Sequence, residues 1–329
     1  MRETVCVTGG LGFVGTRLCA ALNERGYGVI CVDRLSGRYA HGTGADAARR
    51  FTSRPRMQVV VADLGRLDLD RELARAGAVV HLAALPGVRA RHPRASLMAD
   101  NVRATERLVD WAGRHGRRLV LASSSSVYGD AGRGPTSEHA PKAPRSPYAA
   151  SKLAAERACL DAARGEGVDA VIARLFTVFG PGQRPDMALA RWIAALRRDE
   201  AIPWHVHRGG RRELTYVDDA ARGSMAALER GHRGEAYNIA GSGSYSLVAV
   251  RRLIEAQLGR RARLLVRPPS AAEAVRTAAC GAKSERELGY RPAFTLAEGV
   301  RRPLVADRPR AGGAPAPPAP APEAAALAS

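Results

Sequence analysis

The sequence predicts an α/β protein with a doubly wound parallel sheet and a smaller C-terminal lobe that binds the substrate. Three observations predict this fold class. Short apolar strands alternate with helical patterns over the first 180 residues, a glycine-rich turn joins the first strand to the first helix, and the pattern becomes less regular after Gly180. Strands that alternate with helices form parallel sheets that are covered on both faces.

The alternating elements follow one another in a regular order. Apolar runs predict strands at residues 4–8, 28–33, 57–62, 78–83, 118–123 and 170–175. Helical periodicity fills residues 12–25, 69–75, 100–115 and 147–166. After residue 180 we expect helices at 186–198, 218–230 and 247–257, separated by loops.

The glycine-rich turn predicts a dinucleotide site. Gly9, Gly12 and Gly15 give G-x-x-G-x-x-G between the first strand and its helix, with Phe13 and Val14 inside the motif. The glycines permit a tight turn, a close approach of the backbone to a pyrophosphate, and close packing of the helix on the strand. The N-terminus of the helix then directs free N–H groups at the phosphates.

We therefore divide the chain into three parts. Residues 1–180 form a Rossmann-type domain that binds the dinucleotide and carries the catalytic residues, and residues 181–308 mainly form the substrate lobe. Residues 309–329 are almost entirely Ala, Pro and Gly, so we expect a disordered tail.

Acidic residues at strand ends indicate which dinucleotide binds. Asp33 ends the second strand, 18 residues after Gly15, where a carboxylate accepts hydrogen bonds from the ribose hydroxyls and repels a 2′-phosphate. This favours NAD over NADP, although the adjacent Arg34 is of a residue type that receives such a phosphate. Asp63, followed by Leu64, ends the third strand and is expected at the adenine edge.

Tyr148 and Lys152 are predicted to be catalytic. Their spacing of four places both side chains on one face of a helix. The lysine ammonium stabilises the phenolate form of Tyr148, which then removes a hydroxyl proton while hydride leaves for NAD. Lys152 also holds the nicotinamide ribose. Serines 123–126 end the fifth strand, and a hydroxyl among them is expected to share the reacting oxygen with Tyr148.

Composition limits the classes of function. The chain has 329 residues, of which 46% are hydrophobic, with neither a membrane-length apolar run nor a leader, so we expect a cytoplasmic protein without membrane contacts. Five cysteines without C-x-x-C spacing disfavour disulfides and a metal site. The basic residues behind the net charge of +19 are scattered, which favours an anionic small substrate and cofactor, or a general arginine bias, over nucleic acid.

The motifs together resemble the extended short-chain dehydrogenase/reductase family of nucleotide-sugar epimerases, dehydratases and decarboxylases. The resemblance covers roughly residues 4–300. It rests on TGGLGFVG at 8–15, HLAA at 81–84, SSSSVYG at 123–129, YAASK at 148–152, FGP at 179–181 and LTYVDD at 214–219.

The resemblance implies roles for further residues. The catalytic hydroxyl of the family lies four residues before the tyrosine of Val-Tyr-Gly, which is Ser124, and the strand end with Leu82, Ala83 and Ala84 lines the cofactor. The resemblance also implies a homodimer formed through the helices at 100–115 and 147–166.

Differences within the family indicate which reaction to expect. The 4,6-dehydratases carry Asp-Glu after the catalytic hydroxyl, and the glucuronate decarboxylases carry Glu at the second of these positions, where this chain has Ser125 and Ser126. Residues 86–89 and 175–187 resemble UDP-glucuronate 4-epimerases. The resemblance places a set of side chains at the sugar or its diphosphate, namely Pro86, Arg89, Ser124, Ser125, Ser126, Thr177, Arg184 and Arg191.

We therefore expect an enzyme that converts UDP-glucuronate to UDP-galacturonate through a transient 4-keto sugar. A decarboxylase, another sugar-modifying member, and a non-catalytic module that binds NAD are the alternatives. In the nucleotide-binding segment, Arg212 keeps the family position and Arg276 is the nearest match to a second arginine. His207 and Arg208 replace Asp and Gly there, which leaves a nucleotide other than uridine diphosphate open.

Overall fold

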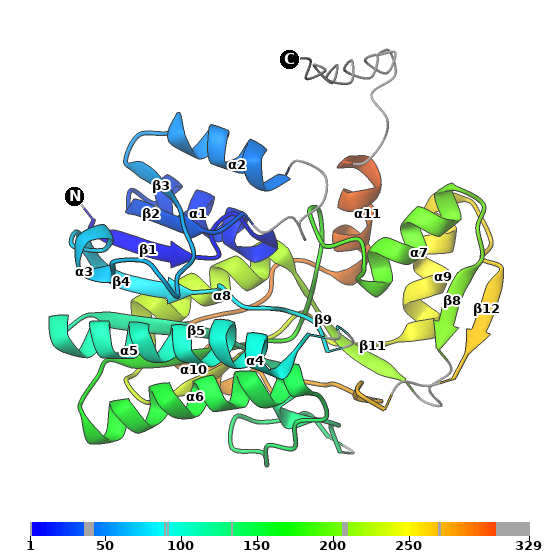
Figure 1. Ribbon diagram of the computed structural model, residues 1–329. Coiled ribbons are helices and arrows are strands. Elements are labelled where there is room, and N and C mark those ends of the chain that lie inside the picture. The colour runs from blue at the N-terminus through cyan, green and yellow to red at the C-terminus, as the bar shows by residue number, and fades with distance from the viewer. Residues whose placement is uncertain are drawn as a thin grey trace, which may run out of the picture.

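A fully parallel sheet is the centre of the protein. The computed structural model describes residues 2–35, 43–88, 90, 92–132, 134–205, 210–268 and 271–306. Within these residues, seven strands pair in the order β10-β6-β5-β4-β1-β2-β3 (Figure 1). They are β1 (Thr4–Thr8), β2 (Gly28–Asp33), β3 (Met57–Val61), β4 (Ala76–His81), β5 (Arg118–Ser124), β6 (Ala170–Leu175) and β10 (Ala236–Ile239). The predicted α/β fold class is confirmed.

The six strands predicted from sequence all occur, with ends that differ by at most two residues. The strand expected at 78–83 runs two residues earlier, as β4, because its last residues leave the sheet to line a cavity. The seventh strand, β10, was not predicted. It has four residues and includes Asn238, and it is a strand only because β6 provides its hydrogen-bond partners.

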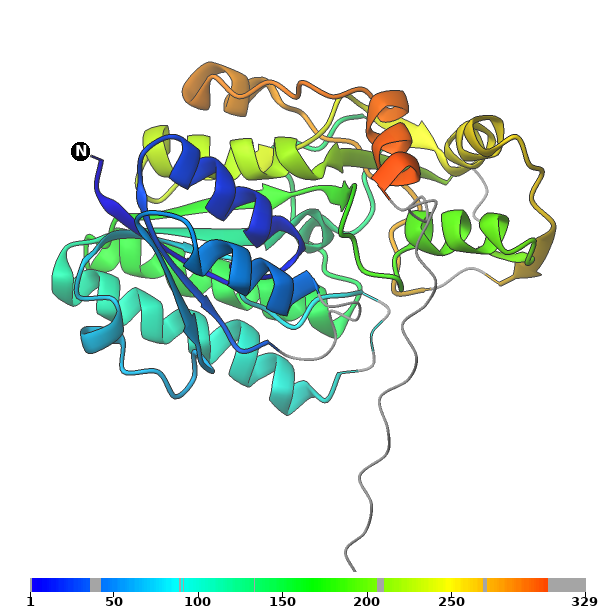
Figure 2. The same ribbon diagram turned by 90° about the horizontal axis from the view of Figure 1, so that it is seen from above.

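Two layers of helices cover the sheet, as Figure 2 shows from above. Alternate strand residues pack against α1 (Phe13–Glu24), α2 (Thr43–Thr52), α8 (Val217–Arg230) and α10 (Ala282–Leu288). The other strand residues pack against α3 (Leu69–Glu72), α5 (Ala104–His115) and α6 (Pro147–Gly165). This is the alternation that a parallel sheet with two buried faces requires.

Local signals set the start of helix α6, which carries Tyr148 and Lys152. The side chain of Ser146 accepts a hydrogen bond from the backbone N–H of Ala149 at 3.1 Å, and Pro147 occupies the first helical turn. The helix expected at 100–115 begins earlier. It runs through α4 (Arg94–Leu97) and a π-helical segment (Met98–Arg103) before α5, and such wide turns often occur at functional sites.

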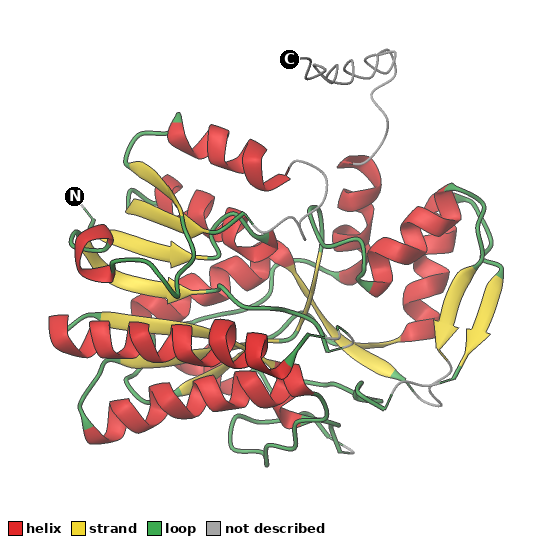
Figure 3. Cartoon of the chain, in the orientation of Figure 1, coloured by secondary structure: helices red, strands yellow, loops and turns green. Residues whose placement is uncertain are grey.

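The C-terminal part of the chain forms a second, smaller core. Strands β7 (Thr177–Phe179), β9 (Arg211–Tyr216) and β11 (Ser244–Ser246) make one sheet, and β8 (Ile202–His205) pairs with β12 (Leu264–Arg267). Helices α7 (Ala188–Arg197), α9 (Leu247–Leu258) and α11 (Leu296–Ala306) pack on them (Figure 3).

The chain after residue 180 contributes to both parts, because α8 and β10 return to the main sheet. The tail expected at 309–329 lies outside the described residues. Among the residues that are described, no helix is long and apolar enough to cross a membrane.

A buried ion pair ties α6 to the sheet. Arg174 on β6 donates to both carboxylate oxygens of Glu156 on α6, at 3.0 and 2.8 Å, and each side chain is at most 3% exposed. The same guanidinium donates to the hydroxyl of Tyr128 at 2.8 Å, and Tyr128 donates to Asn238 on β10 at 2.7 Å. One network therefore connects α6, β6 and β10.

We predict that Glu156→Ala lowers the free energy of unfolding by about 3–5 kcal/mol, because it leaves the Arg174 charge buried without its partner. Urea denaturation followed by circular dichroism measures this loss. Glu166→Ala, at the exposed end of the same helix, is the matched control and should change stability by less than about 0.5 kcal/mol. Equal losses in the two variants would contradict a structural role for the pair.

Candidate active site

Two adjoining cavities lie beyond the carboxyl ends of the strands. They measure about 460 and 420 Å³ and share lining residues that include Phe13, Pro86, Tyr148 and Arg184. The first, here called the sheet-side cavity, lies over β1, β2 and β4, where the strand order reverses. The second, the lobe-side cavity, lies between the sheet and the C-terminal lobe. Ligands of doubly wound sheets bind at such reversal points.

The glycine-rich turn forms one wall of the sheet-side cavity. Gly9 has φ +69°, and a Cβ there would lie 2.7 Å from the backbone N of Ala83. A Cβ on Gly15 would lie 2.1 Å from the carbonyl oxygen of Gly9. Gly12 precedes α1 without a side-chain cap, so the first N–H groups of that helix face the cavity without a competing acceptor. This backbone cradle fits a pyrophosphate.

Acidic residues surround the far end of the same cavity. Asp33 accepts hydrogen bonds from the backbone N–H groups of Leu11 at 3.1 Å and Leu35 at 2.9 Å, which fix its carboxylate. Burial raises the pKa of Asp33, against the opposing effect of these N–H groups. Arg34, Asp63 and Leu64, which are predicted to contact the cofactor, also line this cavity.

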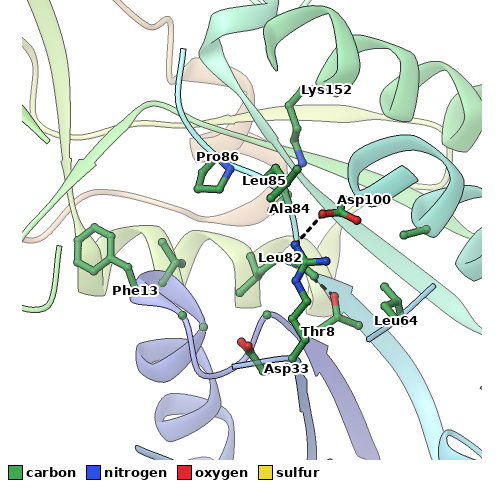
Figure 4. Close-up of a pocket in the computed structure, with 18 of the residues that line it drawn as sticks. Thr8, Phe13, Asp33, Leu64, Leu82, Ala84, Leu85, Pro86, Asp100 and Lys152 are labelled. Carbon is green, nitrogen blue, oxygen red and sulfur yellow. Dashed lines mark hydrogen bonds and ion pairs between the residues drawn. The ribbon is translucent and has the colours of Figure 1, made fainter. Parts of the chain in front are cut away.

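The end of β4 forms the adjoining wall (Figure 4). Leu82, Ala83 and Ala84 line the cavity, and the backbone N–H of Ala83 donates to the hydroxyl of Thr8 at 3.3 Å. The Thr8 hydroxyl also lies 2.6 Å from Nδ1 of His81. Burial, and then the charge of Lys152, lower the pKa of His81 to about 3, so its ring is neutral. The sequence did not predict that Thr8 links His81 to Ala83, because threonine is a common residue within strands.

Tyr148 and Lys152 reach the sheet-side cavity from the first turns of α6. Lys152 is 3% exposed, and burial lowers its pKa to about 8, although the carboxylate of Glu156 opposes the shift. Nearby, the hydroxyl of Ser123 is buried at the cavity and has no hydrogen-bond partner within the described structure. A buried hydroxyl without a partner, in a cavity that Lys152 also lines, suits a polar cofactor ring.

A buried asparagine fastens the start of α6. Asn101, in the π-helical segment, donates to the hydroxyl of Ser151 at 2.9 Å and exchanges hydrogen bonds with both backbone groups of Leu85. Ser151 in turn donates to the carbonyl of Tyr148 at 2.8 Å. Asn101 thereby fixes Tyr148 relative to the chain that follows β4. Sequence reasoning missed it, since only its burial distinguishes it from a surface residue.

The serine cluster lies at the lobe-side cavity, next to Tyr148. The hydroxyl of Ser126 donates to Oγ of Ser124 at 2.9 Å, and the backbone N–H of Ser126 donates to the same oxygen at 3.2 Å. Because the oxygen of Ser124 already accepts twice, its own proton is available to the cavity. Ser125 and Thr177 line the same space.

Most of the predicted substrate residues meet in the lobe-side cavity. Arg184 is held by Asp186 through two hydrogen bonds of 2.8 and 3.1 Å, and Arg212 donates to the carbonyl of Val275 at 2.8 Å. Arg191 and Pro86 also line it. Arg89, His207 and Arg208 lie outside the described residues.

The structure does not place Arg276 among the residues that line the cavity. Its backbone pairs with Asp130 and with β9, and its Nε is buried without a hydrogen-bond partner among the described atoms. Sequence reasoning instead missed Trp192 and Trp204, whose rings lie 5.4 Å apart at the cavity wall. Neither tryptophan belongs to a motif.

Comparison with known proteins gives consistent results. Residues 5–240 match the model of the NAD dependent epimerase/dehydratase family. The structure of a UDP-glucuronic acid 4-epimerase from Bacillus cereus, solved with UDP-glucuronic acid and NAD, aligns with a TM-score of 0.88 at 31% identity, over 92% of this chain and 98% of that one.

Two curated relatives show how widely the reactions vary. An uncharacterized UDP-glucose epimerase of Bacillus subtilis is 34% identical over 92% of this chain and 96% of its own length. A dTDP-glucose 4,6-dehydratase of Streptomyces griseus is 30% identical over 91% and 92% of the two chains. The reactions named for these relatives differ, whereas the matching family model is NAD-dependent and the solved neighbour was determined with NAD. The chain belongs to the NAD-dependent epimerase/dehydratase family, whose members modify nucleotide sugars with NAD.

Proposed function

We propose that the protein epimerises C4 of a nucleotide sugar, with UDP-glucuronate as substrate and UDP-galacturonate as product. The serine cluster is the observation that carries this proposal. Ser125 and Ser126 follow Ser124 in the lobe-side cavity, where an elimination reaction needs an acid and a base. The carboxylates among the described lining residues, Asp186 and Glu273, are both close to arginines. The similarity to the Bacillus cereus 4-epimerase supports the same choice.

In the proposed mechanism, Tyr148 removes the proton of the C4 hydroxyl. Ser124 donates its available proton to a hydrogen bond with the same sugar oxygen, and the ammonium of Lys152 stabilises the phenolate. NAD supplies the chemistry of accepting a hydride from C4 and returning it. The keto sugar turns over in the cavity before the proton and hydride return, so the sugar is inverted without net oxidation.

A glucuronate also presents a hazard, because its 4-keto form is a β-keto acid that loses carbon dioxide readily. Loss is fastest when the breaking bond is perpendicular to the carbonyl plane. We propose that Thr177, Ser125 and Ser126 hold the carboxylate away from that geometry. Arg184 and Arg191 line the same cavity and suit the diphosphate or the carboxylate, since guanidinium groups bind both in a forked geometry.

The first test is the product formed from UDP-glucuronate. We expect a new nucleotide sugar of unchanged mass, identified as UDP-galacturonate by chromatography with mass detection. Thr177→Val should increase the fraction of product that has lost carbon dioxide, because one carboxylate contact is removed. Loss of carbon dioxide in the wild-type reaction would instead indicate a decarboxylase. Absence of turnover would indicate that the substrate is another nucleotide sugar.

The buried lysine predicts a pH dependence. Lys152 has a pKa of about 8, lowered from its usual value, so its ammonium form is present below that pH and is lost as the pH rises through it. We expect kcat/KM to fall above pH 8 as the phenolate loses its stabilising charge. Lys152→Arg stays protonated, so the fall should move to higher pH even if its rate is lower. A wild-type profile that stays level through pH 10 would argue against this role.

We also propose a cytoplasmic homodimer formed through α5 and α6. The outer face of α5 exposes Glu106 and Asp110, and the neighbouring α6 exposes Arg157, so a two-fold arrangement would bring opposite charges together. Light scattering coupled to size-exclusion chromatography should give twice the chain mass, and Arg157→Glu should reduce the dimer fraction. A wild-type protein of single-chain mass would contradict the proposal.

A further inference from the structure

Arg34 occupies a position that bears on cofactor choice. It follows Asp33 at the end of β2 and lines the sheet-side cavity, where the adenosine half of a dinucleotide is expected. An arginine at this point is suited to bind the 2′-phosphate that distinguishes NADP from NAD. The sequence alone therefore contains two opposing signals, a carboxylate that excludes the phosphate and a guanidinium that attracts it.

The structure shows how the guanidinium is engaged. Nη1 of Arg34 lies 3.1 Å from Oδ2 of Asp63, and Nη2 lies 2.6 Å from Oδ2 of Asp100. Both terminal nitrogens thus face carboxylates, and both acids line the same cavity. The bond to Asp100 is the main reason that the pKa of Arg34 is raised. Charge-assisted hydrogen bonds of this kind are short and directional.

Asp100 is held in place by its neighbours. It lies in the π-helical segment Met98–Arg103, and the next residue, Asn101, is 1% exposed and bonded to Leu85 and Ser151. Figure 4 shows Asp100 on the opposite side of the cavity from Asp33. The side chain of Asp100 is only 22% exposed, so its charge is directed across the cavity instead of into bulk water.

The charges at this end of the sheet-side cavity disfavour the 2′-phosphate of NADP. Asp33, Asp63 and Asp100 are three carboxylates that line this end, and the guanidinium of Arg34 contacts those of Asp63 and Asp100. A 2′-phosphate would add a charge of about −1.5 to −2 at this place. It would have to compete with two carboxylates for Arg34 while it is repelled by all three.

We propose that Asp100, together with Asp63, holds the guanidinium of Arg34 away from a 2′-phosphate and so makes the site select NAD over NADP. Asp100 is a specificity-determining residue in this proposal. Its sequence position, 66 residues after Arg34, gives it no place in a local cofactor motif.

The test compares the binding of NAD and NADP by calorimetry, after bound dinucleotide has been removed, and needs no sugar. Asp100→Asn should improve NADP affinity relative to NAD by roughly tenfold, the size of one charge-assisted hydrogen bond. Asp63→Asn should shift the same ratio in the same direction. Asp199→Asn, in the exposed turn after α7, is the matched control and should leave both affinities unchanged.

The double variant Asp100→Asn with Arg34→Ala separates the possible causes. If the released Arg34 binds the phosphate, the double variant loses the gain in NADP affinity. A gain that survives without Arg34 would overturn the proposal, since simple loss of repulsion would explain it. An unchanged NADP/NAD ratio in Asp100→Asn, or an equal loss of both affinities, would overturn it as well. Because only dinucleotide binding is measured, these outcomes are independent of which sugar the enzyme converts.

Discussion

The site depends on how closely the turn after β1 approaches the chain after β4. With Gly9 at positive φ and a space beside it too small for a methyl group, the two backbones lie in direct contact at Ala83. Packing this tight leaves little freedom in either segment. It fixes the position of the glycine-rich turn, where phosphates are expected, relative to the segment after β4 that contacts the start of α6. The backbone contact between these two segments therefore positions the side chains that line the cavity.

Buried polar groups connect this backbone contact to helix α6, which carries Tyr148 and Lys152. Asn101 links the start of α6 to the segment after β4, and Glu156 links the middle of the same helix to Arg174 on β6. Apolar packing alone tolerates small rotations of a helix, whereas paired polar groups in a low-dielectric interior hold one register. Lys152 lies between these two anchors, and Tyr148 lies about one turn before the first, where Ser151 donates to its carbonyl. The two anchors therefore position both side chains.

Local charge, not net charge, decides what each cavity accepts. The chain carries a formal charge of +19, yet Arg34 at one end of the sheet-side cavity is paired with two carboxylates, and a third carboxylate, that of Asp33, lines the same end. The lobe-side cavity is lined by several arginines, of which Arg145, Arg184 and Arg212 are paired with acids. The acidic end of the sheet-side cavity thus suits the neutral ribose expected there. The arginines of the lobe-side cavity suit the expected diphosphate. Coulomb interactions fall quickly with distance in salt, so scattered surface arginines contribute little here.

Features carried by consecutive residues were predictable from the sequence. The glycine-rich turn, the six longer strands and the spacing of Tyr148 and Lys152 are local patterns, because hydrogen-bond geometry and side-chain periodicity act over a few residues. The short strand β10, the anchoring role of Asn101 and the position of Arg276 outside the cavity were not predictable. Each depends on partners that are distant in the chain.

Arg34 shows this division most clearly. Its residue type and its place after Asp33 follow from the sequence, and by themselves they leave its role ambiguous. Only the folded chain brings Asp63 and Asp100 to its two terminal nitrogens. The sequence by itself determined which chemical groups the site contains. The tertiary structure decided which of them meet, because electrostatic and hydrogen-bond energies depend on distances of a few ångströms that no local pattern specifies.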